Sequence, residues 1–401
     1  MERNEDVVVA GHLCLDVIPD LAESEHDWIK EGFLPGRMVQ VGAATISTGG
    51  AVSNTGLALH RLGARVCLVG KIGDDVFGRA VRRIVASFDP DLPHDLVVEE
   101  TAHTSYTVIL NPPGVDRMFL HCPGANDTFG AGDVPYDRVS RARLFHFGYP
   151  PTLKPMFEDG GVQLAQMFRR VKALDRTAPV TTSLDMTFPD PASPAGLADW
   201  RSILRRTLPY VDLILPSLEE ILFMLHRERY ERLCREAGGT AIGPLITPQL
   251  LSEVGQDLLD LGARVVVLKL GERGLYVRTA DRAAMEQMGR AGPVDPDAWV
   301  GKEVWAPCFR VQVAGTTGAG DATVAGFLAA LLRGMSLQET VTAALAVGAC
   351  NVEAVDALGG LRSWEETQQR VVGSWERHPL HVDAPGWQFD SDHHLWWREC
   401  R

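Results

Sequence analysis

The chain lacks the cysteine pattern of a disulfide framework or of a structural zinc site. It has seven cysteines in 401 residues, an odd number, widely scattered and without a C-x-x-C pair. Closely spaced, paired cysteines are typical of small secreted domains and of zinc-binding modules. Their absence argues against both kinds of protein and favours a reducing, intracellular compartment.

Long hydrophobic runs are also missing. The first residues, "MERNEDVVVAG", place charges where a signal peptide needs an apolar stretch. No apolar run elsewhere reaches the roughly 18 residues that a membrane-spanning helix requires. We therefore expect a cytoplasmic protein without a membrane partner.

Positive charge is sparse as well. The net charge is −13 and no basic block interrupts the chain, which argues against nucleic acid as a partner. A free nucleotide is a different matter, because local backbone amides and a metal ion can hold its phosphates in an acidic protein.

Three familiar enzyme motifs are absent. No G-x-G-x-x-G follows a predicted strand, as a dinucleotide-dependent oxidoreductase would require. Neither Gly70-Lys71 nor Gly301-Lys302 precedes the Ser or Thr of a P-loop, and no G-x-S-x-G elbow of a serine hydrolase occurs. These classes of enzyme are disfavoured.

Short β-rich apolar runs alternate with longer amphipathic stretches along most of the chain. Several of the runs are continuously apolar, which indicates strands covered by helices on both faces. The sequence predicts an α/β fold with a mostly parallel sheet. Strands are expected at 6–11, 65–70, 143–148, 180–186, 211–216, 264–271 and 309–315, and helices at 51–63, 74–88, 217–230 and 248–262.

Two regions depart from this alternation, at 19–50 and at 104–126. Neither has a helical period, and the second reads as two strands around a Pro-Pro-Gly turn. We expect a small antiparallel lid, contributed by about 14–48 and 102–126, over the carboxyl edge of the sheet; two ordinary surface loops are the alternative. Exposed strand edges in a lid would favour a homodimer.

The chain end carries four tryptophans among charges: Trp375, Trp387, Trp396 and Trp397. We expect a main domain over residues 1–373 and an extension, 374–401, that packs back on it.

One short motif occurs almost twice, as "DTFGAGD" at 127–133 and as "GTTGAGD" at 315–321. Such small residues let backbone N–H groups approach an anion, and a following helix directs its positive end at that anion. The second copy is followed by "DATVAGFLAALLRG", a strong helical sequence that Gly334 ends. The first copy is followed by Pro135 and a short polar stretch, so we expect Asp133 only to cap a short helix.

With both flanks considered, the sequence resembles the ribokinase-like (PfkB) carbohydrate kinases from about Val7 to about Glu366. "GTTGAGDATVAGFLAALLRG" resembles the family's C-terminal signature, D-T-x-G-A-G-D. "GGAVSNTGLALHRLGARVCLVGKIGDDVFG" at 49–78 resembles its N-terminal signature. The resemblance implies a three-layer αβα fold and an ATP-dependent kinase that uses Mg²⁺ and phosphorylates a hydroxyl of a sugar or sugar acid.

The resemblance also implies a role for individual residues. Asp321 would be the catalytic base, with an anion hole formed by Gly318, Ala319 and Gly320. The substrate would contact Asp16, Gly49, Gly50 and Asn54. Asp185 is a further candidate for a substrate contact, because it lies at the end of a predicted strand and faces the expected pocket. ATP would contact Lys269, Gly271, Gly274 and Thr316, and Glu220 would hold magnesium indirectly, through water.

Three positions depart from the family pattern. Gly315 replaces the first Asp of the signature, which puts activation by a monovalent cation in doubt. Ser217 replaces the Asn of N-x-x-E and makes a capping box with Glu220, so a purely structural role for Glu220 stays open. Lys269 stands where relatives carry Thr or Ser, and it could reach an ATP phosphate or cap a strand edge.

Two other functions remain compatible with these residues. A nucleoside kinase of the same family would use the same machinery, and a catalytically silent sugar- or nucleotide-binding protein would retain the fold. Asp321 and the turn before it favour an enzyme.

Overall fold

The computed structural model describes residues 5–21, 35–36, 38–112, 118–238 and 242–400. It has a ten-stranded main sheet in the order β15-β16-β14-β13-β12-β11-β10-β9-β1-β4. Its strands are β1 (Val7–Gly11), β4 (Val66–Val69), β9 (Leu144–Gly148), β10 (Thr181–Asp185), β11 (Leu213–Ile214), β12 (Val265–Lys269), β13 (Leu275–Thr279), β14 (Lys302–Ala306), β15 (Gln388–Asp390) and β16 (Leu395–Glu399). The predicted α/β fold is confirmed.

The sheet is parallel from β12 through β11, β10, β9 and β1 to β4, and antiparallel beyond β12. In β1 and β9 every residue is buried, as the continuous apolar sequence of β1 predicts; in β9 this includes His146. Since parallel strands share one direction, their carboxyl ends meet at a single edge of the sheet.

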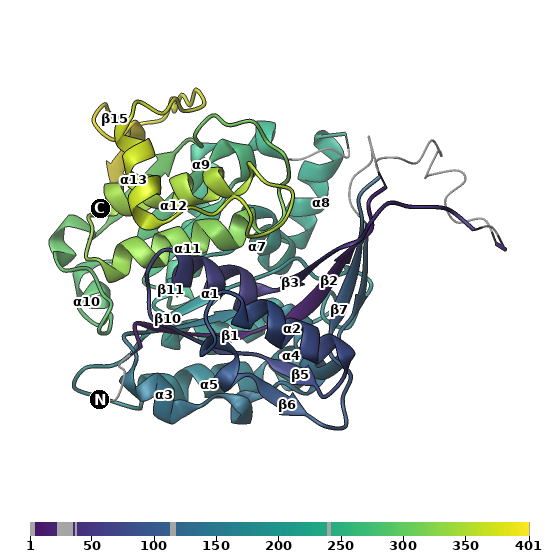
Figure 1. Ribbon diagram of the computed structural model, residues 1–401. Coiled ribbons are helices and arrows are strands. Elements are labelled where there is room, and N and C mark those ends of the chain that lie inside the picture. The colour runs from purple at the N-terminus through teal and green to yellow at the C-terminus, as the bar shows by residue number, and fades with distance from the viewer. Residues whose placement is uncertain (1–4, 22–34, 37, 113–117, 239–241, 401) are drawn as a thin grey trace.

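Helices cover both faces of this sheet and complete three layers (Figure 1). The core on one face includes α1 (Ala51–Arg61), α2 (Val76–Ala86), α11 (Ala319–Leu332) and α12 (Leu337–Asn351), with α13 (Trp364–Val372) at its margin. The core on the other face includes α3 (Tyr136–Arg141), α4 (Lys154–Phe157), α5 (Val162–Lys172), α6 (Trp200–Thr207), α7 (Leu218–Leu225) and α9 (Pro248–Asp260). The helices α8 (Arg227–Glu236) and α10 (Arg282–Met285) are more peripheral.

A smaller, four-stranded sheet projects from the body, at the right of Figure 1. Its order is β3-β2-β7-β8, with β2 (Cys14–Ile18), β3 (Thr45–Gly49), β7 (Tyr106–Leu110) and β8 (Met118–Cys122). This is the expected lid, but one pair is not antiparallel as predicted: β2 and β7 run parallel. They are separate crossings of the chain rather than arms of one hairpin. A further two-stranded sheet pairs β5 (Lys71–Gly73) with β6 (Val97–Glu99).

The tryptophan-rich extension continues the main sheet. Strand β16 pairs antiparallel with β14 and with β15, which is the outermost strand. Trp387 is buried, and Trp375 stacks on Phe309 with ring centroids 4.4 Å apart. The extension therefore covers an edge that β14 would otherwise present to solvent.

Three expected elements differ from the structure. No strand forms at 309–315: β14 is the strand that leads toward the turn, Pro307 follows it, and only a bridge from Phe309 to Arg377 remains. The helix expected at 217–230 divides at His226 into α7 and α8. The strand expected at 211–216 shortens to β11, because local apolar character does not fix where ladder pairing stops.

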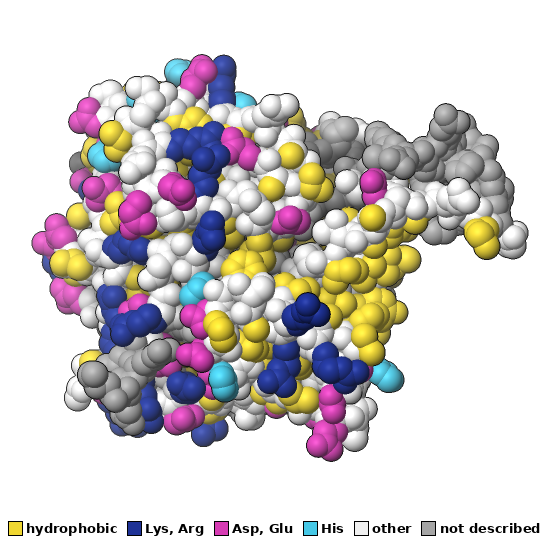
Figure 2. All heavy atoms as spheres, in the orientation of Figure 1, with side chains coloured by type: hydrophobic (Ala, Val, Ile, Leu, Met, Phe, Trp, Pro, Cys, Tyr) yellow, Lys and Arg dark blue, Asp and Glu magenta, His cyan; other side chains and the backbone are white. Residues whose placement is uncertain are grey.

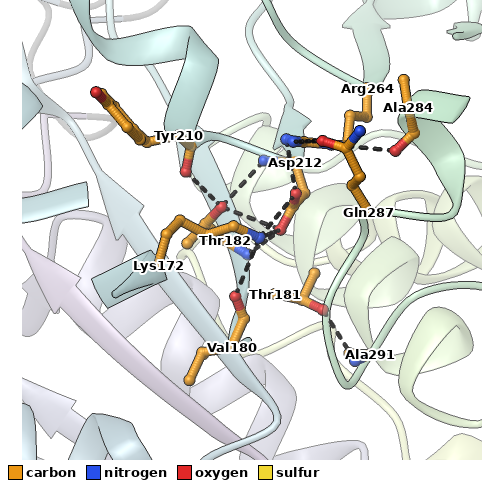
Figure 3. Close-up of polar contacts among 10 residues, drawn as sticks. All are labelled: Lys172, Val180, Thr181, Thr182, Tyr210, Asp212, Arg264, Ala284, Gln287 and Ala291. Carbon is orange, nitrogen blue, oxygen red and sulfur yellow. Dashed lines mark hydrogen bonds and ion pairs between the residues drawn. The ribbon is translucent and has the colours of Figure 1, made fainter. Parts of the chain in front are cut away.

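A buried ion cluster lies at the amino edge of the sheet (Figure 3). Asp212, which is fully buried just before β11, pairs with Lys172 at 2.7 Å and with Arg264 at 2.9 Å. The backbone N–H of Thr182 also donates to Asp212, at 2.8 Å. Both carboxylate oxygens thus have partners, as a buried charge requires.

Among the residues that the structure describes, no helix is long and apolar enough to span a membrane.

Candidate active site

Four polar side chains come together at the carboxyl edge of the sheet. Tyr149 directly follows β9, Asp185 ends β10, Lys269 ends β12, and Asp321 lies in the first turn of α11. Ligands of open α/β sheets bind at this edge. The topology thus gathers residues that lie up to 172 positions apart in the sequence.

Asp321 is almost completely buried, with 3% of its surface exposed. Its Oδ2 accepts a hydrogen bond from Nδ2 of Asn54 at 3.1 Å, and its Oδ1 accepts one from Oγ1 of Thr55 at 3.2 Å. The hydroxyl of Tyr149 donates to both oxygens, at 2.9 and 2.8 Å. The carboxylate is therefore held in one orientation from two sides.

The turn before Asp321 brings backbone amides to the same place. Gly318 is the N-cap of α11, with a left-handed backbone at φ 71° that favours glycine. A Cβ there would also lie only 2.7 Å from Cβ of Ala357. The backbone N–H groups of residues 318–320 lie at the start of the helix, where its partial positive charge favours an anion.

Lys269 and Asp185 form an ion pair beside this turn. Nζ of Lys269 is 2.7 Å from Oδ1 of Asp185, and it lies 3.5 Å from where a Cβ of Gly320 would be. The structure thus places the Lys269 amine next to the amide turn and in contact with a carboxylate, rather than in solvent.

Carboxylates crowd this part of the site and shift one another. Burial raises the pKa of Asp185 to about 7 against the attraction of Lys269, and Glu220 and Asp321 add to the rise. Burial likewise raises the pKa of Glu220, although Lys269 opposes it. For Lys269 burial acts to lower the pKa, but Asp185 and Glu220 outweigh it and the net shift is upward.

Glu220 also makes the capping box that its spacing predicted. The N–H of Ser217 donates to Oε2 of Glu220 at 2.7 Å, and the N–H of Glu220 donates to Oγ of Ser217 at 3.3 Å. One oxygen of the carboxylate caps α7 while the charge still acts on the site.

The donor groups present fit Mg²⁺. Oδ2 of Asp185 is buried and has no partner, in contrast to the fully paired Asp212, and carboxylate oxygens are the ligands that Mg²⁺ prefers. Within the described ranges no three His, Cys, Asp or Glu side chains are placed to ligate one metal ion. Mg²⁺ commonly takes several of its ligands from water and from substrate phosphates and binds one or two carboxylates of the protein.

The lid supplies another carboxylate. Asp16 on β2 is buried, and burial raises its pKa to about 6 while hydrogen bonds from Cys14 and Thr107 oppose the rise. A side chain at Gly49 would overlap the Asp16 carboxylate, so glycine makes room for it. Gly50, at φ 89°, makes room for His12 in the same way.

Beyond the end of β12, Gly271 and Gly274 flank the short turn that leads to β13. Both have positive φ, at 57° and 92°, and a Cβ on Gly271 would meet no atom within 4 Å. Sγ of Cys308 donates to the Gly271 carbonyl at 3.3 Å. The carbonyl of Thr316 accepts from the N–H of Ala319 at 3.3 Å, within the amide turn.

The first copy of the doubled motif lies elsewhere: Asp133 does not cap the helix that follows it, as predicted, but its side chain caps the start of the short 3-10 helix Ala131–Asp133. Its Oδ2 accepts from the N–H of Gly130 at 2.7 Å and pairs with Lys71 at 3.0 Å. Pro135, not Asp133, is the residue that precedes α3. Because α3 begins at Tyr136, Asp133 lies two residues before the N-cap position of that helix.

Three contacts at the site escaped the sequence reasoning: those of Tyr149, Thr55 and His12. Tyr149 could have been found, because it follows the strand expected at 143–148 just as Asp185 ends the strand expected at 180–186. His12 is 5% exposed, both of its ring nitrogens lack a partner, and burial lowers its pKa to about 3, so the ring is neutral.

A helix-terminal amide turn, a fixed carboxylate and a cluster of charges at the carboxyl edge, under a β lid, define a phosphoryl-transfer enzyme of the three-layer αβα class. The model of the pfkB family of carbohydrate kinases matches residues 4–363, so the chain belongs to this family, whose members phosphorylate sugars with ATP.

Curated relatives and solved structures agree with that family. An uncharacterized sugar kinase from Archaeoglobus fulgidus is 25% identical over 76% of this chain and 98% of its own. A nucleoside kinase from Methanothermobacter thermautotrophicus is 23% identical over 94% and 99%. A fructokinase from Xylella fastidiosa with bound ATP shares the fold at a TM-score of 0.63, with 20% identity over 92% of this chain and 99% of that chain. A putative ribokinase II from E. coli with ATP and Mg²⁺ shares it at 0.64, with 17% identity over 92% and 99%.

Proposed function

We propose that the chain transfers the γ-phosphoryl group of ATP to a hydroxyl of a neutral sugar, with Asp321 as the base. The observation that carries this proposal is the position of Asp321, which is fixed by Asn54, Thr55 and Tyr149 immediately beside the 318–320 amides. A base and an anion hole in contact are what transfer to an alcohol needs.

Each group then has a stated task. Asp321 accepts the proton of the attacking hydroxyl, and the 318–320 amides face the charge that develops on the transferred group. Lys269 and the 271–274 turn lie on the ATP side. Bound Mg²⁺, held by Asp185 and by Glu220 through water, would neutralise phosphate charge. Asp16, Asn54 and the neutral His12 would hold acceptor hydroxyls, which would give the His12 ring nitrogens the partners they lack.

Charge favours a neutral acceptor over a sugar acid. In the described part of the chain, the charges of Asp185, Glu220 and Asp321 act on one another, that of Asp321 also acts on Asp16, and Lys269 is the cation that interacts with the first three. An anionic acceptor would add to this repulsion, and Lys269 is already paired.

The test is ADP release by the full-length enzyme with ATP and Mg²⁺, using acceptors in matched pairs. Each neutral sugar or polyol is compared with its own aldonic acid or phosphate, and nucleosides form a separate arm. We expect neutral sugars to stimulate ADP release at least tenfold more than their acids. A preference for the acids would contradict the neutral acceptor, a nucleoside preference would favour a nucleoside kinase, and no stimulation by any compound would favour a silent binding protein.

The same assay has an arm for monovalent cations, because Gly315 offers no carboxylate. A Cβ there would lie 2.7 Å from the carbonyl oxygen of Val355, and the N–H of Gly315 donates to the Val352 carbonyl at 3.2 Å. The 352–355 loop thus fills the space of a side chain. We propose that the enzyme needs no monovalent cation, so its rate in K⁺ and in tetramethylammonium should agree within about twofold. Strong activation by K⁺ would contradict this.

We further propose that two copies pair through the lid. Phe119 and Leu120 on the edge strand β8 are 57% and 55% exposed, and hydrophobic side chains gather over the lid in Figure 2. An exposed apolar strand edge is a pairing surface. Sedimentation should show a dimer at micromolar concentration and a monomer for the F119E/L120E variant. A wild-type monomer at that concentration would exclude the pairing.

A further inference from the structure

Tyr149 has a strained and firmly held backbone. Its φ of 66° and ψ of 47° lie in the left-handed region, which bulky side chains rarely adopt. Its N–H donates to the Asp185 carbonyl at 3.2 Å, and Oγ1 of Thr152 donates to the Tyr149 carbonyl at 2.8 Å. Strain that the surroundings maintain in this way is concentrated at functional sites. Here it directs the ring at Asp321.

Three donors share the two carboxylate oxygens of Asp321. A carboxylate offers two lone pairs on each oxygen. Oδ1 faces Thr55 and Tyr149, and Oδ2 faces Asn54 and Tyr149. A substrate hydroxyl that approaches this carboxylate competes with these donors, above all with the Tyr149 hydroxyl, which lies within 2.9 Å of both oxygens.

Of these hydrogen-bond donors, Tyr149 is the one that a hydroxyl of the sugar substrate can replace. Asn54 and Thr55 are adjacent residues of the buried helix α1, whereas Tyr149 lies at a strand end. Its phenolic O–H is also the same kind of donor as a sugar hydroxyl. Burial and the Asp321 charge raise the pKa of Tyr149 well above its usual value, so the phenol stays protonated and keeps donating.

We infer that the Tyr149 hydroxyl caps Asp321 in the free enzyme, and that an acceptor must displace it to reach the base. This inference rests on the proposed role of Asp321. A sugar held by several contacts displaces the phenol, whereas a single water molecule does not. Tyr149 therefore sets the preference for the acceptor over water.

The suppressed side reaction is ATP hydrolysis. In it a water molecule loses a proton to Asp321, its oxygen bonds to the γ-phosphorus, and the bond from that phosphorus to the bridging oxygen of ADP breaks. The products are ADP and phosphate. Removing the phenolic oxygen exposes the same base to water.

The experiment measures phosphate release without acceptor and phosphoryl transfer with acceptor, for wild type and Tyr149→Phe. We expect hydrolysis to rise about tenfold or more in the variant, since a hydrogen bond to a charged group is lost. We also expect the KM for the acceptor to fall. In Y149F/D321N the added hydrolysis should disappear. Tyr136→Phe is the matched control, because the Tyr136 hydroxyl donates to the Ala131 carbonyl instead, and it should leave both rates unchanged.

The outcomes separate the inference from the proposal beneath it. A Tyr149→Phe enzyme with an unchanged ratio of hydrolysis to transfer overturns the inference. A lower kcat with an unchanged KM and no added hydrolysis overturns it too, because Tyr149 would then only position Asp321. If Asp321→Asn alone keeps full transfer activity, the proposed base is wrong whatever Tyr149 does.

Discussion

Replacing Asp321 with asparagine is expected to lower kcat by about 10²- to 10⁴-fold, the usual contribution of a general base. Asparagine has nearly the same shape: its one carbonyl oxygen can still accept from Asn54 and Tyr149, and its NH₂ group can donate to the Thr55 hydroxyl, which can also act as an acceptor. The asparagine amide cannot, however, take up the proton of the attacking sugar hydroxyl. Single-turnover measurements should show a slow chemical step, whereas the Kd for ATP should change by less than about twofold. The loss would then lie in the chemical step and not in ATP binding.

The first copy of the doubled motif provides the control for this substitution. Asp133→Asn changes the equivalent carboxylate of "DTFGAGD", which pairs with Lys71 instead of lining the site. Its kcat should stay within about twofold of wild type. A kcat for D321N within threefold of wild type would show that another group acts as the base.

Removing the carboxylate of Asp212 is expected to be the most damaging change outside the site. Asp212→Ala leaves the Lys172 amine and the Arg264 guanidinium without their shared partner, and these side chains are only 14% and 11% exposed (Figure 3). Breaking a buried ion pair from one side typically costs about 3–5 kcal/mol. Urea denaturation should show a loss of that size in the free energy of unfolding.

The control is an ion pair in solvent. Asp6 pairs with Arg65 at 2.9 Å, but the Arg65 side chain is 60% exposed, so Asp6→Ala should cost no more than about 1 kcal/mol. The Asp212→Ala enzyme that remains folded should keep its kcat, because Asp212 lies at the amino edge, opposite the site. A loss below about 1 kcal/mol for Asp212→Ala would mean that water replaces the carboxylate.

Local sequence predicted the elements whose signals are local. The buried strand β1 and the helix α1, with Gly63 at φ 88° just after it, lie where the apolar pattern and the glycine placed them. The strand expected at 309–315 does not form, because pairing there depends on a segment far away in the sequence. Its backbone partner is Arg377 in the C-terminal extension, and no pattern within seven residues reveals a partner that distant.

The candidate site divides in the same way. Asp321 could be chosen over Asp133 from sequence, because the helix after it has a strong local signal. The hydrogen-bond partners of Asp321 could not be predicted from sequence, since Asn54 and Thr55 approach it from α1 and Tyr149 from the end of β9. Likewise, Lys269 could be assigned to the sheet edge, but not to its ion pair with Asp185.

The sequence by itself determined the class of fold, the family and the identity of the proposed base, because these depend on periodicity and on short motifs. Only the tertiary structure decided that Tyr149 covers that base, that the extension completes the sheet and that a loop fills the space beside Gly315. These features arise where segments distant in the chain come within hydrogen-bonding distance. Such distances depend on the packing of the whole domain and are not encoded in any single segment.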